Sequence, residues 1–242
     1  MPSEEADGTG EAGKTVISSL RKDTCMNAAG KCIIMCAGDF TPVDIEVNSD
    51  DLLIAADNGL QYLRELGRMP DVIIGDFDSL NPDYRGFLNE FQRLPDKELL
   101  ALPVEKDDTD TLSAVRFGLK RGYRTFEIYG ALGGRFDHSF ANIQTLIFIK
   151  NQGAEGCILD EKQKLFILKD ETLELEDGLY SGFSVFALDP VVRGVTIRGM
   201  KYELENAELT RDFPIGCSNE LPAAGRAVIT VREGMVLAVL RR

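Results

Sequence analysis

The 242-residue sequence has no tryptophan, a single histidine and no apolar run long enough to span a membrane. Its first dozen residues are polar and acidic, so we expect no signal peptide and no membrane partner. The net charge of -13 argues against a nucleic-acid-binding protein, which needs a basic surface. The five cysteines lack CxxC spacing, and Cys32 and Cys36 lie in an apolar run. We therefore expect reduced core thiols, no zinc site and a cytoplasmic protein.

The N-terminal segment 1–27, called the leader below, contains a full match to the phosphate-loop pattern between Gly8 and Thr15. Such a loop binds phosphate because a buried strand delivers it to a helix N-terminus. Residues 1–7 are too polar and acidic to form that strand. We therefore interpret the match, including Lys14, as accidental and expect a flexible leader.

Short apolar runs alternate with helical patterns between residues 28 and 160. The runs cover 32–36, 52–56, 72–74, 99–102, 126–129 and 157–159, and the helical patterns cover 58–66, 81–91, 108–120 and 137–150. This alternation is typical of an α/β domain with a doubly wound, mostly parallel sheet. From 161 to 242, strand-like runs separated by turn residues predict a second, all-β domain, a sandwich or barrel.

Acidic residues follow the predicted strands or precede the predicted helices at four places. They are Asp57, Asp76 with Asp78, the trio Asp107, Asp108 and Asp110, and Asp137. The carboxyl ends of strands in an open α/β sheet face the ligand crevice. Carboxylates gathered there would bind a hard cation such as the Mg²⁺ of a nucleotide complex.

The pair Asp76 and Asp78 has two ordinary explanations besides metal binding. On an extended backbone, residues two apart point to the same side, so both carboxylates could share one cation. Asp and Ser also favour strand-to-helix turns. In an aspartyl-phosphate phosphatase, the first Asp after such a strand would be the nucleophile.

The segment 107–110 follows Lys106 and would place three like charges at a helix N-terminus. Helix capping, for instance by Asp108 or Thr109, explains one or two of them. A bound cation explains all three better.

The glycine-rich segment 130–134 leads into Arg135, Asp137 and the only histidine, His138. Glycines let backbone amides approach a phosphate closely, and an arginine can grip phosphate oxygens bidentately. A tight turn with a surface ion pair is the alternative. For His138, a general base and a helix-cap role are about equally supported.

In this order, the motifs resemble those of the thiamine pyrophosphokinase family. Its patterns correspond to Ala56–Gly59, Gly75–Ser79, Asp107–Asp110 and Gly134–Asp137, and downstream to Gly199–Leu204 and Gly216–Glu220. The resemblance runs from about Lys31 to the C-terminus and includes both predicted domains.

The resemblance implies Mg²⁺-dependent transfer of the pyrophosphoryl group of ATP to the thiamine hydroxyl, giving thiamine diphosphate and AMP. It implies homodimers with shared active sites, so Tyr202 would serve the other protomer. The implied residues are Asp76, Asp78, Asp110 and Asp137 for metal and catalysis, with Lys106 on phosphate, then Asp57, Asn58, Thr109, Arg135 and His138 for the nucleotide, and Tyr202, Ser218 and Asn219 for thiamine.

The sequence departs from the family at three places. Asn58 stands where a glycine is frequent, Tyr202 replaces the tryptophan of some members, and His138 falls where glutamine also occurs. Two other functions stay open: a haloacid-dehalogenase-type phosphatase built on Asp76 and Asp78, and a non-catalytic nucleotide- or thiamine-binding sensor. The phosphatase leaves the downstream motifs unexplained.

Overall fold

The computed structural model describes residues 30–77, 84–103, 107–175, 178–222 and 225–242. These residues form two compact units. The α/β unit consists of residues 30–167 and 239–242, and the β unit consists of residues 168–238. The leader, Asp78 and Lys106 lie outside the described residues.

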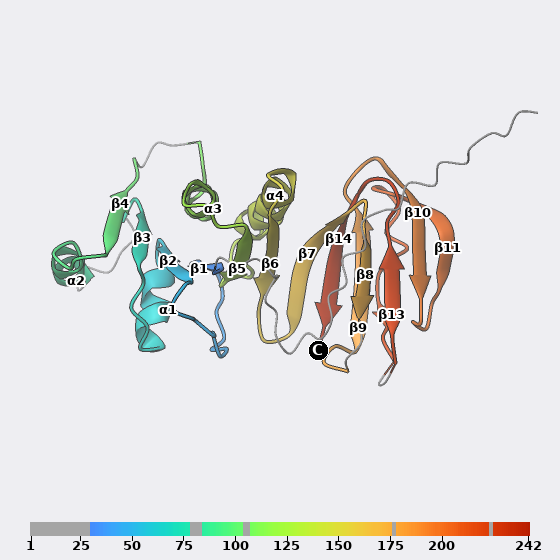
Figure 1. Ribbon diagram of the computed structural model, residues 1–242, viewed down its shortest axis with the longest axis horizontal. Coiled ribbons are helices and arrows are strands. Elements are labelled where there is room, and N and C mark those ends of the chain that lie inside the picture. The colour runs from blue at the N-terminus through green and yellow to red at the C-terminus, as the bar shows by residue number, and fades with distance from the viewer. Residues whose placement is uncertain (1–29, 78–83, 104–106, 176–177, 223–224) are drawn as a thin grey trace, which may run out of the picture. The chain divides into compact units, whose positions relative to one another are not determined.

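The α/β unit is built on a mostly parallel sheet whose strands are buried (Figure 1). In pairing order its parallel strands are β6 (Glu155–Leu159), β5 (Thr125–Tyr129), β1 (Cys32–Met35), β2 (Leu52–Ala56), β3 (Val72–Gly75) and β4 (Glu98–Ala101). An antiparallel strand, β7 (Gln163–Lys169), pairs with β6. Chain order reverses between β1 and β5, which is the topological switch point where open α/β sheets bind ligands.

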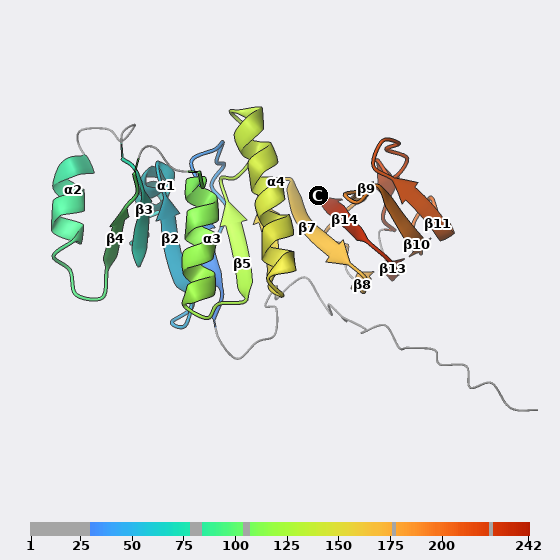
Figure 2. The same ribbon diagram turned by 90° about the horizontal axis from the view of Figure 1, so that it is seen from above.

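Helices cover both faces of this sheet, which confirms the predicted doubly wound fold. They are α1 (Gly59–Glu65) and α2 (Tyr84–Phe91) on one face, and α3 (Asp110–Lys120) and α4 (Phe136–Asn151), side by side in Figure 2, on the other. Alternation along β1 explains the two faces. Ile33 packs in one core cluster with Leu60 of α1 and Phe91 of α2. Cys32 points the other way, since a Cβ added to Gly118 of α3 would lie 2.8 Å from its Sγ.

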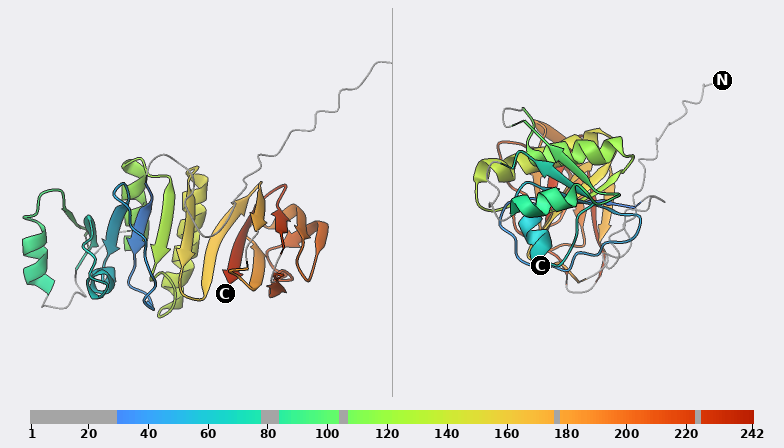
Figure 3. Two further views of the ribbon diagram at one scale, coloured as in Figure 1. Left: turned by 60° about the horizontal axis from the view of Figure 1, so that its bottom comes forward. Right: turned by 90° about the vertical axis from the view of Figure 1, so that its left-hand side faces the viewer.

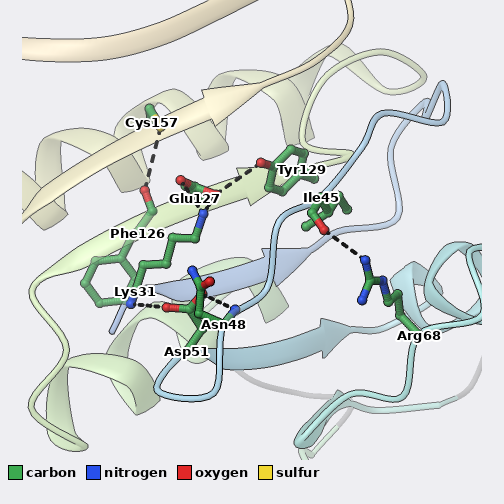
Figure 4. Close-up of polar contacts among 9 residues, drawn as sticks. All are labelled: Lys31, Ile45, Asn48, Asp51, Arg68, Phe126, Glu127, Tyr129 and Cys157. Carbon is green, nitrogen blue, oxygen red and sulfur yellow. Dashed lines mark hydrogen bonds and ion pairs between the residues drawn. The ribbon is translucent and has the colours of Figure 1, made fainter. Parts of the chain in front are cut away.

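A buried ion pair joins β5 to the residue that precedes β1 (Figure 4). The Lys31 ammonium donates to both carboxylate oxygens of Glu127 at 3.0 and 2.9 Å, and the Tyr129 hydroxyl donates to one of them at 3.1 Å. Burial raises the pKa of Glu127, while the bonds from Lys31 and Tyr129 oppose the rise. The centre of the sheet is therefore fixed by a polar network beneath the switch point.

The β unit is antiparallel, and its strands are orange to red in Figure 3. One sheet contains β11 (Leu204–Thr210), β10 (Val191–Arg198), β13 (Ala227–Thr230) and β8 (Thr172–Leu175), and beside it run β12 (Asn219–Glu220), β9 (Gly182–Ala187) and β14 (Met235–Arg241). Apolar side chains from both groups, such as Val185 and Ile229, are buried. The predicted all-β sandwich is confirmed.

Two sequence-based expectations about solubility and thiols can be compared with the structure. Within the described residues, no helix is long and apolar enough to cross a membrane. Cys32 and Cys36 are buried and free, as predicted.

Candidate active site

Two loops meet at the switch point, one after β1 and one after β5. Their backbones stay hydrogen-bonded beyond the strands: the N–H of Cys36 donates to the Tyr129 carbonyl at 2.8 Å, and that of Gly38 to the Gly130 carbonyl at 2.7 Å. A third bond joins the Asp39 N–H to the Leu132 carbonyl at 2.8 Å. The glycine-rich loop 130–134 is thus fastened to the loop after β1.

Glycine is required in this loop. Gly130, Gly133 and Gly134 have φ values of 59°, 80° and 57°, in the left-handed region that side chains disfavour. A Cβ on Gly133 would lie 2.3 Å from Asp39 Oδ2, so there is no room for one. Asp39 Oδ2 also accepts a hydrogen bond from the Gly134 N–H at 3.1 Å. Sequence reasoning missed Asp39, although an acid directly after a strand is the signal that selected Asp57 and Asp76.

Asp57 and Asp76 follow the neighbouring strands β2 and β3. Asp57 has a φ of 50°, and its N–H donates to the Ile74 carbonyl of β3 at 2.8 Å. Its Cα would lie 3.2 Å from a Cβ on Gly75, so Asp57 lies against the backbone that leads into Asp76. Asn58 is the N-cap of α1 but makes no side-chain cap bond. The structure therefore brings two predicted carboxylates to one edge.

The geometric argument for Asp76 and Asp78 was wrong in one respect. Phe77, between them, has a φ of 60°, so the backbone is not extended there. The Phe77 ring packs against the core cluster beneath the sheet edge. The direction of the Asp76 carboxylate is consequently set by a turn and not by strand alternation.

The start of α3 lies beside the end of β1. Thr109 is the N-cap, and its hydroxyl accepts from the Leu112 N–H at 3.2 Å, so the helix begins at Asp110. Burial raises the pKa of Cys36 to about 12, and the nearby Asp110 carboxylate contributes to the rise. Asp108 forms an ion pair with Arg116 of α3. One of the three acids thus has a partner within the protein, as the capping alternative allowed.

The start of α4 carries an exposed bidentate ion pair. Arg135 Nε donates to Asp137 Oδ1 at 3.2 Å, and its Nη2 donates to Oδ2 at 2.6 Å. These bonds raise the pKa of Arg135 and lower that of Asp137. Asp137 also accepts from the backbone N–H of His138, whose side chain is exposed. The surface ion pair is therefore present, and Arg135 has to exchange one anion for another to bind a phosphate.

The predicted thiamine residues gather in the β unit. The Tyr202 side chain is 59% exposed, and the Lys201 ammonium lies 5.4 Å from its ring centroid. Asn219 is buried, and its amide bonds the Tyr202 backbone twice: Oδ1 accepts from the N–H at 3.0 Å, and Nδ2 donates to the carbonyl at 2.7 Å. Ser218 is exposed, with a φ of 63°. Asn219 therefore holds Tyr202, a role that its motif did not reveal.

The comparisons with known proteins agree with this arrangement. Residues 43–158 match the family model described as the catalytic domain of thiamin pyrophosphokinase, and residues 171–236 match its vitamin B1 binding domain. The chain belongs to the thiamin pyrophosphokinase family. Thiamine pyrophosphokinase of Bacillus subtilis (strain 168) is 28% identical over 194 residues, which cover 78% of this chain and 86% of that protein. Thiamin pyrophosphokinase 1 of Caenorhabditis elegans is 29% identical over 161 residues, 63% of each chain.

Solved structures of thiamin pyrophosphokinases have the same fold. The crystal structure of the Bacillus subtilis protein superposes with a TM-score of 0.77 at 24% identity, covering 87% of this chain and 98% of that one. The protein from Geobacillus thermodenitrificans gives a TM-score of 0.74 at 27% identity, covering 88% and 97%. The likeness thus extends over both units of this family member.

The family's two domain models divide the chain between residues 158 and 171, and the structure divides it between Ile167 and Leu168. A boundary at Asp160 stays a prediction. Among the residues that the structure describes, no group of three or more His, Cys, Asp or Glu side chains is placed to hold a metal ion. The cage of four acidic clusters is not assembled by those residues alone.

Proposed function

We propose that this protein is a thiamine pyrophosphokinase, which transfers the pyrophosphoryl group of ATP to the hydroxyl of thiamine and releases AMP. The observation that carries this proposal is the match of both family domains, in order, over a chain whose predicted acids follow β2 and β3 and flank the helices α3 and α4. Neither a phosphatase nor a sensor accounts for both domains together.

In the proposed complex, the ATP phosphates lie at the switch point. The loop 130–134 offers backbone N–H groups there, and α4, with 16 residues, directs its N-terminus toward the same loop. Arg135 would release Asp137 and bind phosphate oxygens, since a guanidinium suits either anion. Thr109 and Asn58 at the starts of α3 and α1, together with Asp57, would contact the nucleotide.

The described donor set fits a Mg²⁺ ion that arrives with the nucleotide. Mg²⁺ is usually held by one or two carboxylates, with phosphate oxygens and water completing the shell, so no protein cage of three acids is needed. Asp76 and Asp110, at the ends of β3 and the start of α3, would supply such carboxylates with Asp78 and Asp137. When bound, the cation would neutralise the triphosphate and hold it in line.

The protein's own residues would then position the reactants. The thiamine hydroxyl oxygen forms a bond to the β-phosphorus of ATP, the bond from that phosphorus to the bridging oxygen of AMP breaks, and the hydroxyl proton goes to a carboxylate or to water. We assign the orientation of the hydroxyl to the metal-side acids and the neutralisation of phosphate to Lys106 and Arg135. Catalysis of this kind consists mainly of positioning and charge stabilisation.

Thiamine is a cation with a flat aminopyrimidine ring, and Tyr202 offers an exposed aromatic face. Lys201 already places a cation near that ring, at 5.4 Å, which supports the assignment. Ser218 would contact thiamine directly and Asn219 would act through Tyr202. Because the acids belong to the α/β unit and Tyr202 to the β unit, we propose a homodimer with shared sites. The free thiols of the described cysteines support a reducing, cytoplasmic compartment.

A coupled assay of AMP release tests the proposal. Purified protein with ATP, Mg²⁺ and thiamine should produce AMP, and omission of thiamine should stop it. Inorganic phosphate released without thiamine would favour the phosphatase. Binding of ATP or thiamine without turnover would favour the sensor.

A further inference from the structure

Asp39 is the one acidic side chain in contact with the glycine-rich loop that the sequence motifs do not include. It follows β1 directly and lies on the near side of the switch point. Its carboxylate Oδ2 accepts from the Gly134 N–H at 3.1 Å, and its side chain fills the space beneath Gly133. Its own N–H donates to Leu132 at 2.8 Å.

The segment that carries Asp39 is itself held in place. The Tyr62 hydroxyl of α1 donates to the Gly38 carbonyl at 2.8 Å, and the Phe40 and Tyr62 rings lie 5.0 Å apart. The Gly38 N–H bonds Gly130 at the other end of the loop. Asp39 thus connects a fixed support on β1 and α1 to a loop whose glycines have unusual backbone freedom.

What Asp39 fixes is the residue before Arg135. Gly134 immediately precedes Arg135, the N-cap of α4, so the direction of the Gly134 peptide decides where the guanidinium starts. A loop with three glycines at positive φ would otherwise populate several conformations, and binding a phosphate would have to select one of them.

We propose that Asp39 is a positioning residue for pyrophosphoryl transfer, which holds Gly134 so that the loop and Arg135 are already placed for the nucleotide phosphates. This rests on the proposed function. Asp39 acts through the loop, and the property that it supplies is a hydrogen-bond acceptor of the right length. An asparagine can supply the same acceptor, whereas a leucine of similar size cannot.

The test compares Asp39→Leu and Asp39→Asn with Asp44→Leu, a control that removes an exposed acid from the same segment. Three quantities are measured: kcat and KM for each substrate, ATP affinity by calorimetry without thiamine, and amide hydrogen exchange of segment 130–135. Asp39→Leu should weaken ATP binding and lower kcat/KM for ATP by roughly tenfold, the usual effect of losing a hydrogen bond to a charged acceptor. The KM for thiamine should stay within about twofold of wild type, because the β unit is untouched.

Asp39→Asn should restore ATP affinity to within about threefold of wild type and should exchange like wild type, whereas Asp39→Leu should exchange faster in segment 130–135. Wild-type ATP affinity and exchange in Asp39→Leu would overturn the proposal. Tighter ATP binding in both variants would also overturn it, because Asp39 would then be an anion that competes with phosphate for the Gly134 N–H. If wild type released no AMP, the proposed function would fail, while ATP affinity and exchange would still report on Asp39.

Discussion

Replacing Asn219 by alanine should lower the stability of the β unit and weaken thiamine binding together. The Asn219 amide makes three hydrogen bonds to backbone: two to Tyr202 at 3.0 and 2.7 Å, and one from the Glu220 N–H at 2.9 Å. A neutral hydrogen bond contributes about 1 kcal/mol net, which sets a limit of about 3 kcal/mol for the three. Because Tyr202 is largely exposed, water can replace part of this, and we expect a loss of roughly 2 kcal/mol.

Tyr202→Ala is the matched variant, since it removes the ring but leaves the backbone clamp intact. Its stability should stay within about 0.5 kcal/mol of wild type, as for most exposed positions, while its KM for thiamine rises. Equilibrium urea unfolding gives the free energies of unfolding, and initial rates give KM for thiamine and for ATP.

The clamp predicts that Asn219→Ala changes both quantities and Tyr202→Ala only one. Wild-type stability of Asn219→Ala would refute the clamp. If its KM for thiamine nevertheless rose, the original interpretation of Asn219 as a direct thiamine contact would be the better one.

Four further predictions concern the other elements of the site. Asp78→Asn should abolish turnover with an unchanged circular dichroism spectrum, because it removes a charge from the proposed cation site without a change of shape, and normal activity would contradict the metal role. Deleting the leader, or replacing Lys14 by alanine, should leave ATP binding and activity nearly unchanged, and a loss of ATP binding in either variant would restore the rejected phosphate loop. Mixing inactive Asp78→Asn chains with inactive Tyr202→Ala chains should recover activity in mixed dimers, and no recovery from confirmed heterodimers would exclude shared sites. Without nucleotide, the pKa of Asp137 lies below its ordinary value because Arg135 binds it, so the pair stabilises the fold above the ordinary Asp pKa and this is lost as pH falls through the lowered one; in a titration followed by carboxyl NMR, Arg135→Gln should raise the Asp137 pKa, and an unchanged value would show that the pair does not form in solution.

Much of the fold could be predicted because strands buried on both faces have continuous apolar sequences. The runs at β1, β2 and β3 are of this kind, and each is fully buried. β11 was missed, since its Glu-rich sequence is mostly exposed and its strand conformation depends on pairing with β10. β8, with its alternating Thr and Glu, was missed for the same reason.

The site residues were predictable as motifs, but their contacts were not. The positive φ of Phe77 cannot be read from its residue type, so the extended-backbone argument for Asp76 failed. The pairing of Asp108 with Arg116 depends on how α3 begins, and that of Asp39 with Gly134 depends on the order of strands in the sheet. Each of these is a tertiary contact between segments that the sequence pattern treats separately.

The central claim is that two phosphoryl groups of ATP move to thiamine as one unit. The most direct measurement follows the products of ATP labelled at either the α- or the γ-phosphate, with thiamine and Mg²⁺, by separating and identifying each labelled compound. We predict that γ-label appears in thiamine diphosphate and α-label in AMP, in equal amounts and only when thiamine is present. Labelled thiamine monophosphate with ADP, or labelled inorganic phosphate without thiamine, would contradict the account.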